Sequence, residues 1–371
     1  MNGVIAGINV GTIENCTNYV SITVPSGTTP GNMHRYTAAI ASVNNGSIIS
    51  CVNYGYIHGE QYASGITGLQ NATGKMENCI NYATIKGGGF KAAGICGETK
   101  GGSVTGCINY GDVTGTQYTG GIIGLNAAAL SNCENYGSVT QTSSERAGGI
   151  VGHTSVAISN CNNYGTIKGK NYVAGIAGYA TATISDCENH AIVSGGQWIG
   201  GIVGRSTKNI TNCVSNGNVT GTADFVGGIV GASDGTTRTL KNCLNNGAVQ
   251  GVGYIGGIDG RPYAGTVTYD SCINNGTVTA TFTTDAARGS AGGIVGRTDV
   301  AKGILINCQS NGTVTAKSAG AYIGLNSTSD TTGYVIYDSC TTTLTGNAIG
   351  YDKTLLASIP LEGFVYTKTE E

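Results

Sequence analysis

The sequence has little charge and few of the residues that fill irregular globular cores. Only 11% of its 371 residues are charged, the formal net charge is −2, and there are four prolines, three methionines and one tryptophan. A disordered chain would combine high net charge with few β-branched residues, whereas Ile, Val and Thr are plentiful here. Nucleic-acid binding requires clustered Lys and Arg. We therefore expect an ordered chain with no nucleic-acid partner.

Several chemical signatures are missing as well. No run approaches 18 consecutive apolar residues, so we expect no transmembrane helix and no membrane contact within this chain. There is no C-x-x-C or H-E-x-x-H spacing, which argues against a zinc site. Glycoside hydrolysis requires two carboxylates at a fixed separation, and the acidic residues are scattered. We expect no catalytic residues, no metal and no cofactor.

What the sequence does contain is one repeated unit. Twelve of its thirteen cysteines recur 26 to 36 residues apart in a single context. The residue three before each Cys is apolar, the residue two after it is Asn in nine copies, and the residue six after it is Ile or Val in all but the last copy. The twelve are Cys16, Cys51, Cys79, Cys107, Cys133, Cys161, Cys187, Cys213, Cys243, Cys272, Cys308 and Cys340.

Each unit holds three short apolar runs, which are too short for ordinary helices and are bounded by Gly or Asn. Three strands and three corners fit one coil of a parallel β-helix, whose stability comes from stacking on its neighbours. The sequence therefore predicts an all-β, right-handed parallel β-helix of about twelve coils of 26–36 residues. The handedness follows from the general rule for parallel crossovers.

Stacking in register would turn each position of the unit into a column. The Asn two after Cys should point inward and bond to the next Asn, and the thiols should form a buried column. Neighbouring coils would be ~4.8 Å apart, a separation that a disulfide tolerates, so disulfide pairing stays an alternative to free thiols.

One column exceeds what the fold requires. Three residues after Cys, six consecutive copies carry Tyr, and most later copies carry Asn. We predict that these tyrosines point outward and offer ring faces to a ligand; the alternative is that the rings stack, shield the corners and fix the register of the coils. The candidates are Tyr19, Tyr54, Tyr82, Tyr110, Tyr136 and Tyr164. A second aromatic column precedes the Gly-Gly pair and comprises Tyr62, Tyr118, Tyr172, Trp198, Phe225 and Tyr254.

Isolated ionisable residues complete the candidates. The densest acidic region contains Asp234, Asp259, Asp270 and Asp285, which we interpret as solvated loop acids, although Asp259 replaces a Val or Ala of the repeat. The histidines share no motif and are expected at surfaces or corners; they are His34, His58, His153 and His190.

The repeat resembles a known family. Its GIVG and GIIG elements, followed by I-x-N-C and G-x-V-x-G, resemble the GLUG-motif repeats of bacterial surface proteins over about residues 3–350. Such repeats occur in adhesin-like proteins and in the N-terminal region of immunoglobulin-A-cleaving metallopeptidases. The elements lie at 121–124, 149–152, 201–204, 228–231 and 293–296.

The resemblance implies a non-catalytic stalk or adhesin-type module at the bacterial cell surface, monomeric, that binds a host or environmental glycan or protein. The N-terminus has no basic or apolar signal region, so we interpret the chain as part of a longer protein, with a solenoid over 1–350 and a tail or linker over 351–371. The alternatives are a glycan-cleaving β-helix enzyme and the substrate-recognition region of a secreted metallopeptidase. The Thr-x-Thr pattern of an ice-binding face is too irregular here.

Overall fold

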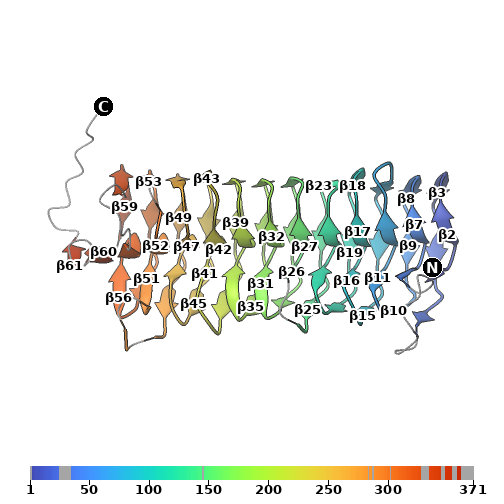
Figure 1. Ribbon diagram of the computed structural model, residues 1–371, viewed down its shortest axis with the longest axis horizontal. Helices are drawn as coiled ribbons and strands as arrows, with labels where there is room; N and C mark the ends of the chain where they lie inside the picture. Colours follow the sequence, from blue (N-terminus) through green and yellow to red (C-terminus); the bar gives the residue numbers. More distant parts are fainter. Residues whose placement is uncertain are drawn as a thin grey trace. The chain divides into compact units, whose positions relative to one another are not determined.

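The computed structural model describes residues 2–24, 35–143, 146–282, 284–285, 288–300, 302–326, 334–343, 347–352 and 357–360. The chain divides into two compact units, Met1–Thr181 and Ala182–Glu371. The described residues form strands, turns and bends, and no helix among them is long and apolar enough to cross a membrane. Figure 1 shows that both units are built from stacked coils.

Each complete coil consists of five short strands, one in each of five sheets. In the third coil these are β11 (Tyr62–Ser64), β12 (Thr67–Gln70), β13 (Lys75–Glu77), β14 (Ile80–Asn81) and β15 (Ile85–Gly87). In the second unit, β41 (Val226–Gly227), β42 (Val230–Ser233), β43 (Thr237–Lys241), β44 (Leu244–Asn245) and β45 (Val249–Gly251) form an equivalent coil. All these strands pair in parallel with the coils next to them, which confirms the predicted parallel β-solenoid.

The prediction of three strands per coil was wrong, because two of the three runs bend. The run around Cys breaks at the residue before the cysteine, which has a positive φ in most copies, for example 54° at Asn78 and 52° at Asn160. Asn tolerates this left-handed conformation better than most residues do. The Gly-Gly run also breaks into two strands, such as β16 (Lys91–Ala93) and β17 (Cys96–Thr99), but Gly94 between them is not among the residues with positive φ.

The described part holds about ten complete turns, slightly fewer than the twelve predicted. The first unit contains complete coils from β1 (Asn2–Gly3) to β30 (Ile167–Lys168), and the second from β36 (Gln197–Gly200) to β55 (Val314–Thr315). The five strands from β31 (Asn171–Ala174) to β35 (Val193–Gly195) are divided between the two units, and the strands after β55 form an incomplete coil. Near the end of the chain, β60 (Asn347–Asp352) pairs in parallel with β57 (Ile323–Asn326) and antiparallel with β61 (Ala357–Pro360). Residues 353–356 and 361–371 of the predicted tail lie outside the described residues.

The core consists of the columns that the repeat predicts. Ile48, Met76 and Val104, each three residues before a Cys, are fully buried and lie opposite one another in register. Ten of the twelve repeat cysteines are buried, and Cys16 and Cys340 are half-buried. Since each coil adds one side chain to every column, the apolar contacts are made mainly between neighbouring coils, as in other repeat proteins.

A buried asparagine ladder runs beside the cysteine column, as predicted. In the first unit, each Asn Nδ2 donates a 2.8 Å hydrogen bond to the Oδ1 of the next Asn, from Asn18 through Asn53, Asn81, Asn109 and Asn135 to Asn163. The same Nδ2 also donates to the carbonyl two residues later in its own coil, such as that of Gly111. The ladder satisfies amides that would otherwise be costly to bury.

Candidate functional site

The six predicted tyrosines form one continuous surface feature, which we call the tyrosine ladder. Each follows the second strand of the cysteine corner, for example β14 for Tyr82 and β19 (Ile108–Asn109) for Tyr110. Their exposed fractions fall from 74% at Tyr19 to 39% at Tyr164. Neighbouring ring centroids are 4.7–5.2 Å apart and the interplanar angles are 2–15°. The outward position and the spacing of the column are therefore as predicted.

The expectation that the ladder offers ring faces to a ligand was wrong. Because neighbouring rings are nearly parallel and less than about 5.5 Å apart, each interior ring stacks on both neighbours, in the offset geometry that aromatic pairs favour. What the ladder presents to solvent is a row of ring edges and phenolic hydroxyls. The stacking agrees with the alternative, in which the rings shield the corner; the repeat spacing could not decide between the two because it fixes the distance between rings and not their tilt.

A column of aliphatic side chains lies on the same side of the sheet as the tyrosine ladder, and the sequence analysis did not predict it. Val52, Ile80 and Ile108 directly follow the cysteines, point away from the core and are half-buried. They alternate with the inward Asn, so they share a face with the tyrosines two residues later. The alternation of inward and outward residues in the strand after each cysteine could have predicted this column. Together the two columns make a contiguous, partly apolar strip on the first unit.

One hydroxyl of the ladder is bound to a carboxylate. Tyr136 Oη donates a 2.9 Å hydrogen bond to Glu134, and this bond raises the pKa of Tyr136 to about 12. Glu134 lies in the same outward column as Ile108. The strip therefore combines hydrogen-bonding hydroxyls, one carboxylate and aliphatic groups.

In the second unit, Asn occupies the position three residues after Cys that Tyr occupies in the first unit. Asn216, Asn246, Asn275 and Asn311 occupy the site three residues after Cys and are exposed. Their side-chain amides bond to one another at 2.8–2.9 Å. Asn therefore closes this corner with a ladder of its own, and a Tyr is not required to do so.

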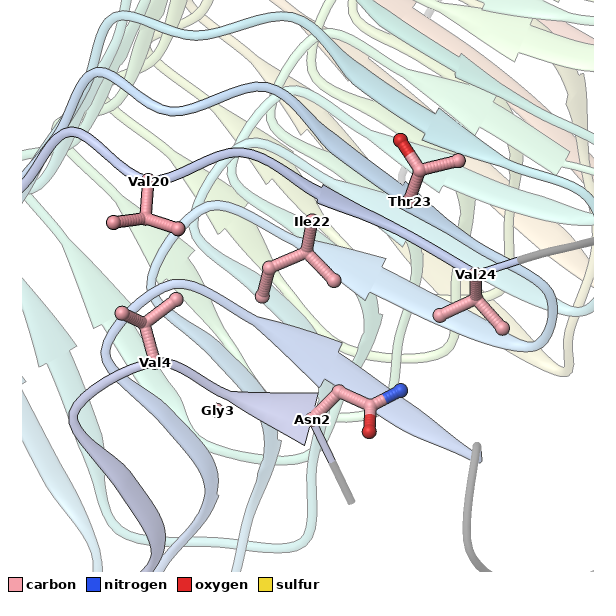
Figure 2. A pocket seen from close by; sticks show the side chains of 7 residues that line it. All are labelled: Asn2, Gly3, Val4, Val20, Ile22, Thr23 and Val24. Carbon is pink, nitrogen blue, oxygen red and sulfur yellow. The ribbon is translucent and has the colours of Figure 1, made fainter.

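A cavity of about 450 Å³ lies at the first coil (Figure 2). It is lined by Asn2, Gly3, Val4, Val20, Ile22, Thr23 and Val24, none of which is ionisable. The sequence did not predict it, because the cavity depends on how the first coil exposes side chains that are buried in later coils. Val4 and Val20, for example, are 37% and 57% exposed. The cavity offers apolar contact and no acid or base.

The acidic residues divide into two groups. Asp285 is exposed as expected, and Asp234 and Asp270 are partly exposed in ion pairs with Arg205 and Lys241, which hold the pKa values of both carboxyls below their usual range. Asp259 does not fit the prediction of a solvated acid. Its side chain is fully buried, and burial raises its pKa to about 6.

The histidines do not converge on one site. His34 lies outside the described residues, and His58 and His190 are partly exposed. His153 is half-buried between Tyr118 and Tyr179, and burial together with the nearby Arg146 lowers its pKa to about 4. The described residues contain no group of His, Cys, Asp and Glu arranged to hold a metal ion.

Comparisons with known proteins gave no relative. No protein-family model matches the sequence, and neither curated proteins nor solved structures yielded a match. The resemblance to GLUG-motif repeats therefore depends on the repeat residues themselves and stays a prediction.

Proposed function

We propose that this chain is a non-catalytic binding module of a bacterial surface protein, and that its tyrosine ladder contacts an extended glycan or protein partner. The observation that carries the proposal is the ladder itself: six tyrosines, each at least 39% exposed, recur at one position in consecutive coils. Exposed, contiguous apolar surface is typical of interaction sites.

The contrast between the two units supports a role beyond folding. Asn closes the same corner in the second unit with hydrogen bonds of 2.8–2.9 Å. Keeping bulky, partly exposed rings at this position in six coils therefore needs another explanation. Tyr is enriched at recognition surfaces because it combines a large apolar ring with a hydrogen-bonding hydroxyl and few rotatable bonds.

The geometry favours an extended partner over a compact one. Hydroxyls and ring edges recur about every 5 Å along the ladder, and the column of Val52, Ile80 and Ile108 runs parallel to it. A polymer lying along the strip would meet similar contacts at each coil. Each contact is weak, so affinity would come from repetition along the polymer. The GLUG resemblance supports the placement at the cell surface.

The test is a side-by-side screen of the full chain and a triple variant on glycan and peptide arrays. The variant Tyr82→Asn/Tyr110→Asn/Tyr136→Asn places in three coils of the first unit the residue that the second unit has at this position. We expect it to lose at least one ligand class that the wild-type chain binds. Identical binding profiles for the two folded proteins would contradict the proposal, as would a wild-type chain that binds no polymer.

A further inference from the structure

Five strands of the first coil are each the first strand of their sheet in the described part of the chain. Sheet edges in proteins are normally protected by Lys, Pro or β-bulges, because an exposed edge pairs readily with another chain. Residues 2–24 contain no Lys or Pro and a single charged residue, Glu14, so this edge is suited to pairing with an added strand. The five strands are β1 (Asn2–Gly3), β2 (Ala6–Asn9), β3 (Thr12–Glu14), β4 (Thr17–Asn18) and β5 (Ile22–Thr23).

The strand β5 directs backbone groups at the open edge. The Ile22 N–H donates to the Tyr56 carbonyl of the second coil at 2.8 Å, and the Val24 N–H donates to a carbonyl of the same coil at 2.9 Å. Consecutive residues of a parallel strand bond to opposite neighbours, so the N–H and C=O of Thr23 point to the other side. A strand placed beside β5 would therefore find one donor and one acceptor at Thr23.

The cavity at the first coil lies beside this strand (Figure 2). Figure 2 shows Val20, Ile22 and Val24 pointing from one wall toward the segment that contains Val4. In the next coil the partner of Ile22, Ile57, is fully buried, whereas Val4 and Val20 are 37% and 57% exposed. A strand paired with β5 would direct every second side chain inward, in the same sense as Ile22. The cavity is therefore suited to aliphatic side chains of such a strand.

Val20 disfavours a further coil of the same repeat at this place. It corresponds in register to Gly55 of the second coil, and the position holds only Gly or Ala in the coils from there to Gly312. A Cβ on Gly55 would collide with the carbonyl of Val20, its counterpart in the preceding coil. The branched side chain of Val20 would meet a coil stacked before it in the same way. A single strand along β5 does not have to follow the chain through that corner.

We propose that this edge of the first coil binds an extended apolar peptide segment of a partner protein, which adds a strand to β5. Main-chain hydrogen bonds at Thr23 would hold the peptide, and its alternate aliphatic side chains would occupy the cavity. A glycan has no such side chains, and a small apolar molecule would leave the strand edge unpaired. The proposal does not depend on the tyrosine ladder, because none of the residues that line the cavity belongs to it.

The experiment follows the fluorescence polarisation of a labelled peptide during titration with the full chain. The probe is a blocked heptapeptide of alternating valine and threonine. One comparison peptide has an N-methylated backbone, which removes the main-chain donors, and another has asparagine in place of valine. We expect both to bind at least about tenfold more weakly than the probe, because each lacks one of the two kinds of contact. No binding of the probe, or equal binding of either comparison peptide, would overturn the proposal.

Two pairs of variants locate the site. Thr23→Pro removes the N–H that faces the open edge but no bond to the second coil, and it should weaken probe binding about tenfold. Thr23→Val keeps that N–H and should change the affinity less than about twofold. Val20→Lys places a charge at the cavity and should also weaken binding about tenfold. Its control is Val10→Lys, since Val10 is 79% exposed in the same coil and does not line the cavity.

Equal effects of a variant and its control would contradict the assigned site. The peptide comparisons use the unaltered chain, so the test stays decisive if a variant fails to fold. A second copy of the chain is the rival occupant of the edge, and sedimentation of the chain alone examines it. We expect a monomer. A dimer that Val20→Lys dissociates and Val10→Lys does not would assign the edge to a second copy and overturn the proposal.

Discussion

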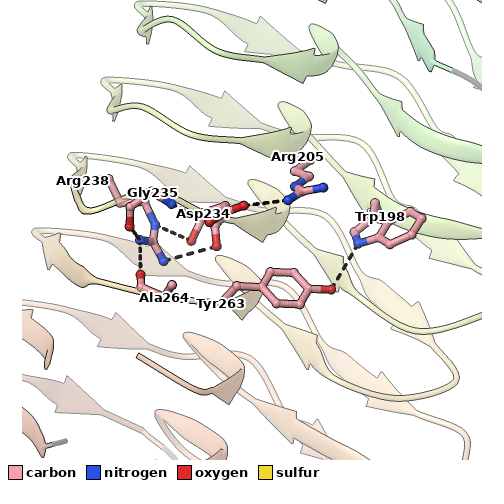
Figure 3. Close-up of polar contacts among 8 residues, drawn as sticks. Trp198, Arg205, Asp234, Gly235, Arg238, Tyr263 and Ala264 are labelled. Atoms are coloured by element: carbon pink, nitrogen blue, oxygen red, sulfur yellow. Dashed lines mark hydrogen bonds and ion pairs between the residues drawn. The ribbon is translucent and has the colours of Figure 1, made fainter. Parts of the chain in front are cut away.

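Asp259, Arg238 and Tyr269 form a polar cluster inside the second unit, each at most 1% exposed. Asp259 accepts hydrogen bonds from the hydroxyls of Ser233 and, at 2.8 Å, Tyr269. Arg238 donates to the Ser233 hydroxyl at 3.0 Å. It also donates to the Ala264 carbonyl at 2.6 Å (Figure 3). In the register of its sheet, Asp259 lies opposite Val230 of one neighbouring coil and Val295 of the other. It therefore replaces an apolar residue that both neighbouring coils retain.

Removing one member of this cluster should be more harmful than removing all three. Asp259→Val introduces the residue that both neighbouring coils have at this position, but it leaves the Arg238 guanidinium buried without an anion. We therefore expect a loss of about 3–5 kcal/mol in the free energy of unfolding. The triple variant Asp259→Val/Arg238→Val/Tyr269→Leu copies adjacent residues at every site and should recover most of that loss. Denaturant unfolding measures both. Equal destabilisation of the two variants contradicts this account.

Asp259 should also make stability depend on pH. Its pKa is raised to about 6 in the folded chain, from an ordinary value near 4, so the folded state binds more protons than the unfolded state between these values. Its contribution is therefore complete below about pH 4 and is lost as the pH rises through about 6. Between about pH 4 and 6 the free energy of unfolding of the wild-type chain should fall relative to that of Asp259→Asn. Above about pH 6 the difference between the two chains should stay constant. A constant difference from pH 4 to 7 contradicts the assignment.

At the scale of a strand, the asparagine ladder shows where the repeat is weakest. Ser215 in β39 (Val214–Ser215) replaces the inward Asn, and its hydroxyl has no hydrogen-bond partner. The Oδ1 of Asn245, its neighbour in register, also lacks a partner. Gly201 packs against Ser215 as Gly149 packs against Asn163, so the space around the site resembles that of the intact ladder.

Ser215→Asn should therefore stabilise the second unit. The new Nδ2 would donate to Asn245 Oδ1, and we expect a gain of about 0.5–1.5 kcal/mol in the free energy of unfolding. Ser185→Asn, at a half-buried outward position of β33 (Ile184–Ser185), is the control and should change little. Thermal unfolding distinguishes the two. If Ser215→Asn destabilises the chain, the interrupted ladder is not a defect that Asn can repair.

The cysteine column raises a separate question about the same strands. The thiols are free and mostly buried, and burial raises the pKa of Cys133, which lowers its reactivity. We expect all thirteen cysteines to react with a thiol reagent in denaturant without prior reduction, and only a few to react in the folded chain. A count well below twelve in denaturant would mean that neighbouring coils are joined by disulfides.

At the scale of the whole chain, the repeat predicted most of the fold. Because coils stack in register, a position such as the Asn two after Cys must be inward in every coil, and its alternation places Tyr and the residue after Cys outward. Ring stacking in the tyrosine column was one of two alternatives, whereas the bend at Asn78 and the burial of Asp259 were not predicted. The bend depends on a backbone angle that the residue type permits but does not require. The burial of Asp259 depends on the Tyr269 hydroxyl and the Arg238 charge in adjacent strands, which stabilise the buried carboxyl.

The central claim is that the tyrosine ladder exceeds what folding requires, and denaturant unfolding of the Tyr82→Asn/Tyr110→Asn/Tyr136→Asn variant tests it most directly. Loss of four ring contacts at about 0.5–1.5 kcal/mol each would be partly offset by new amide hydrogen bonds of similar strength. We predict a cooperatively folded chain that is less stable by about 1–3 kcal/mol. A variant with no cooperative unfolding transition would show that the rings hold the fold together, and would contradict the account.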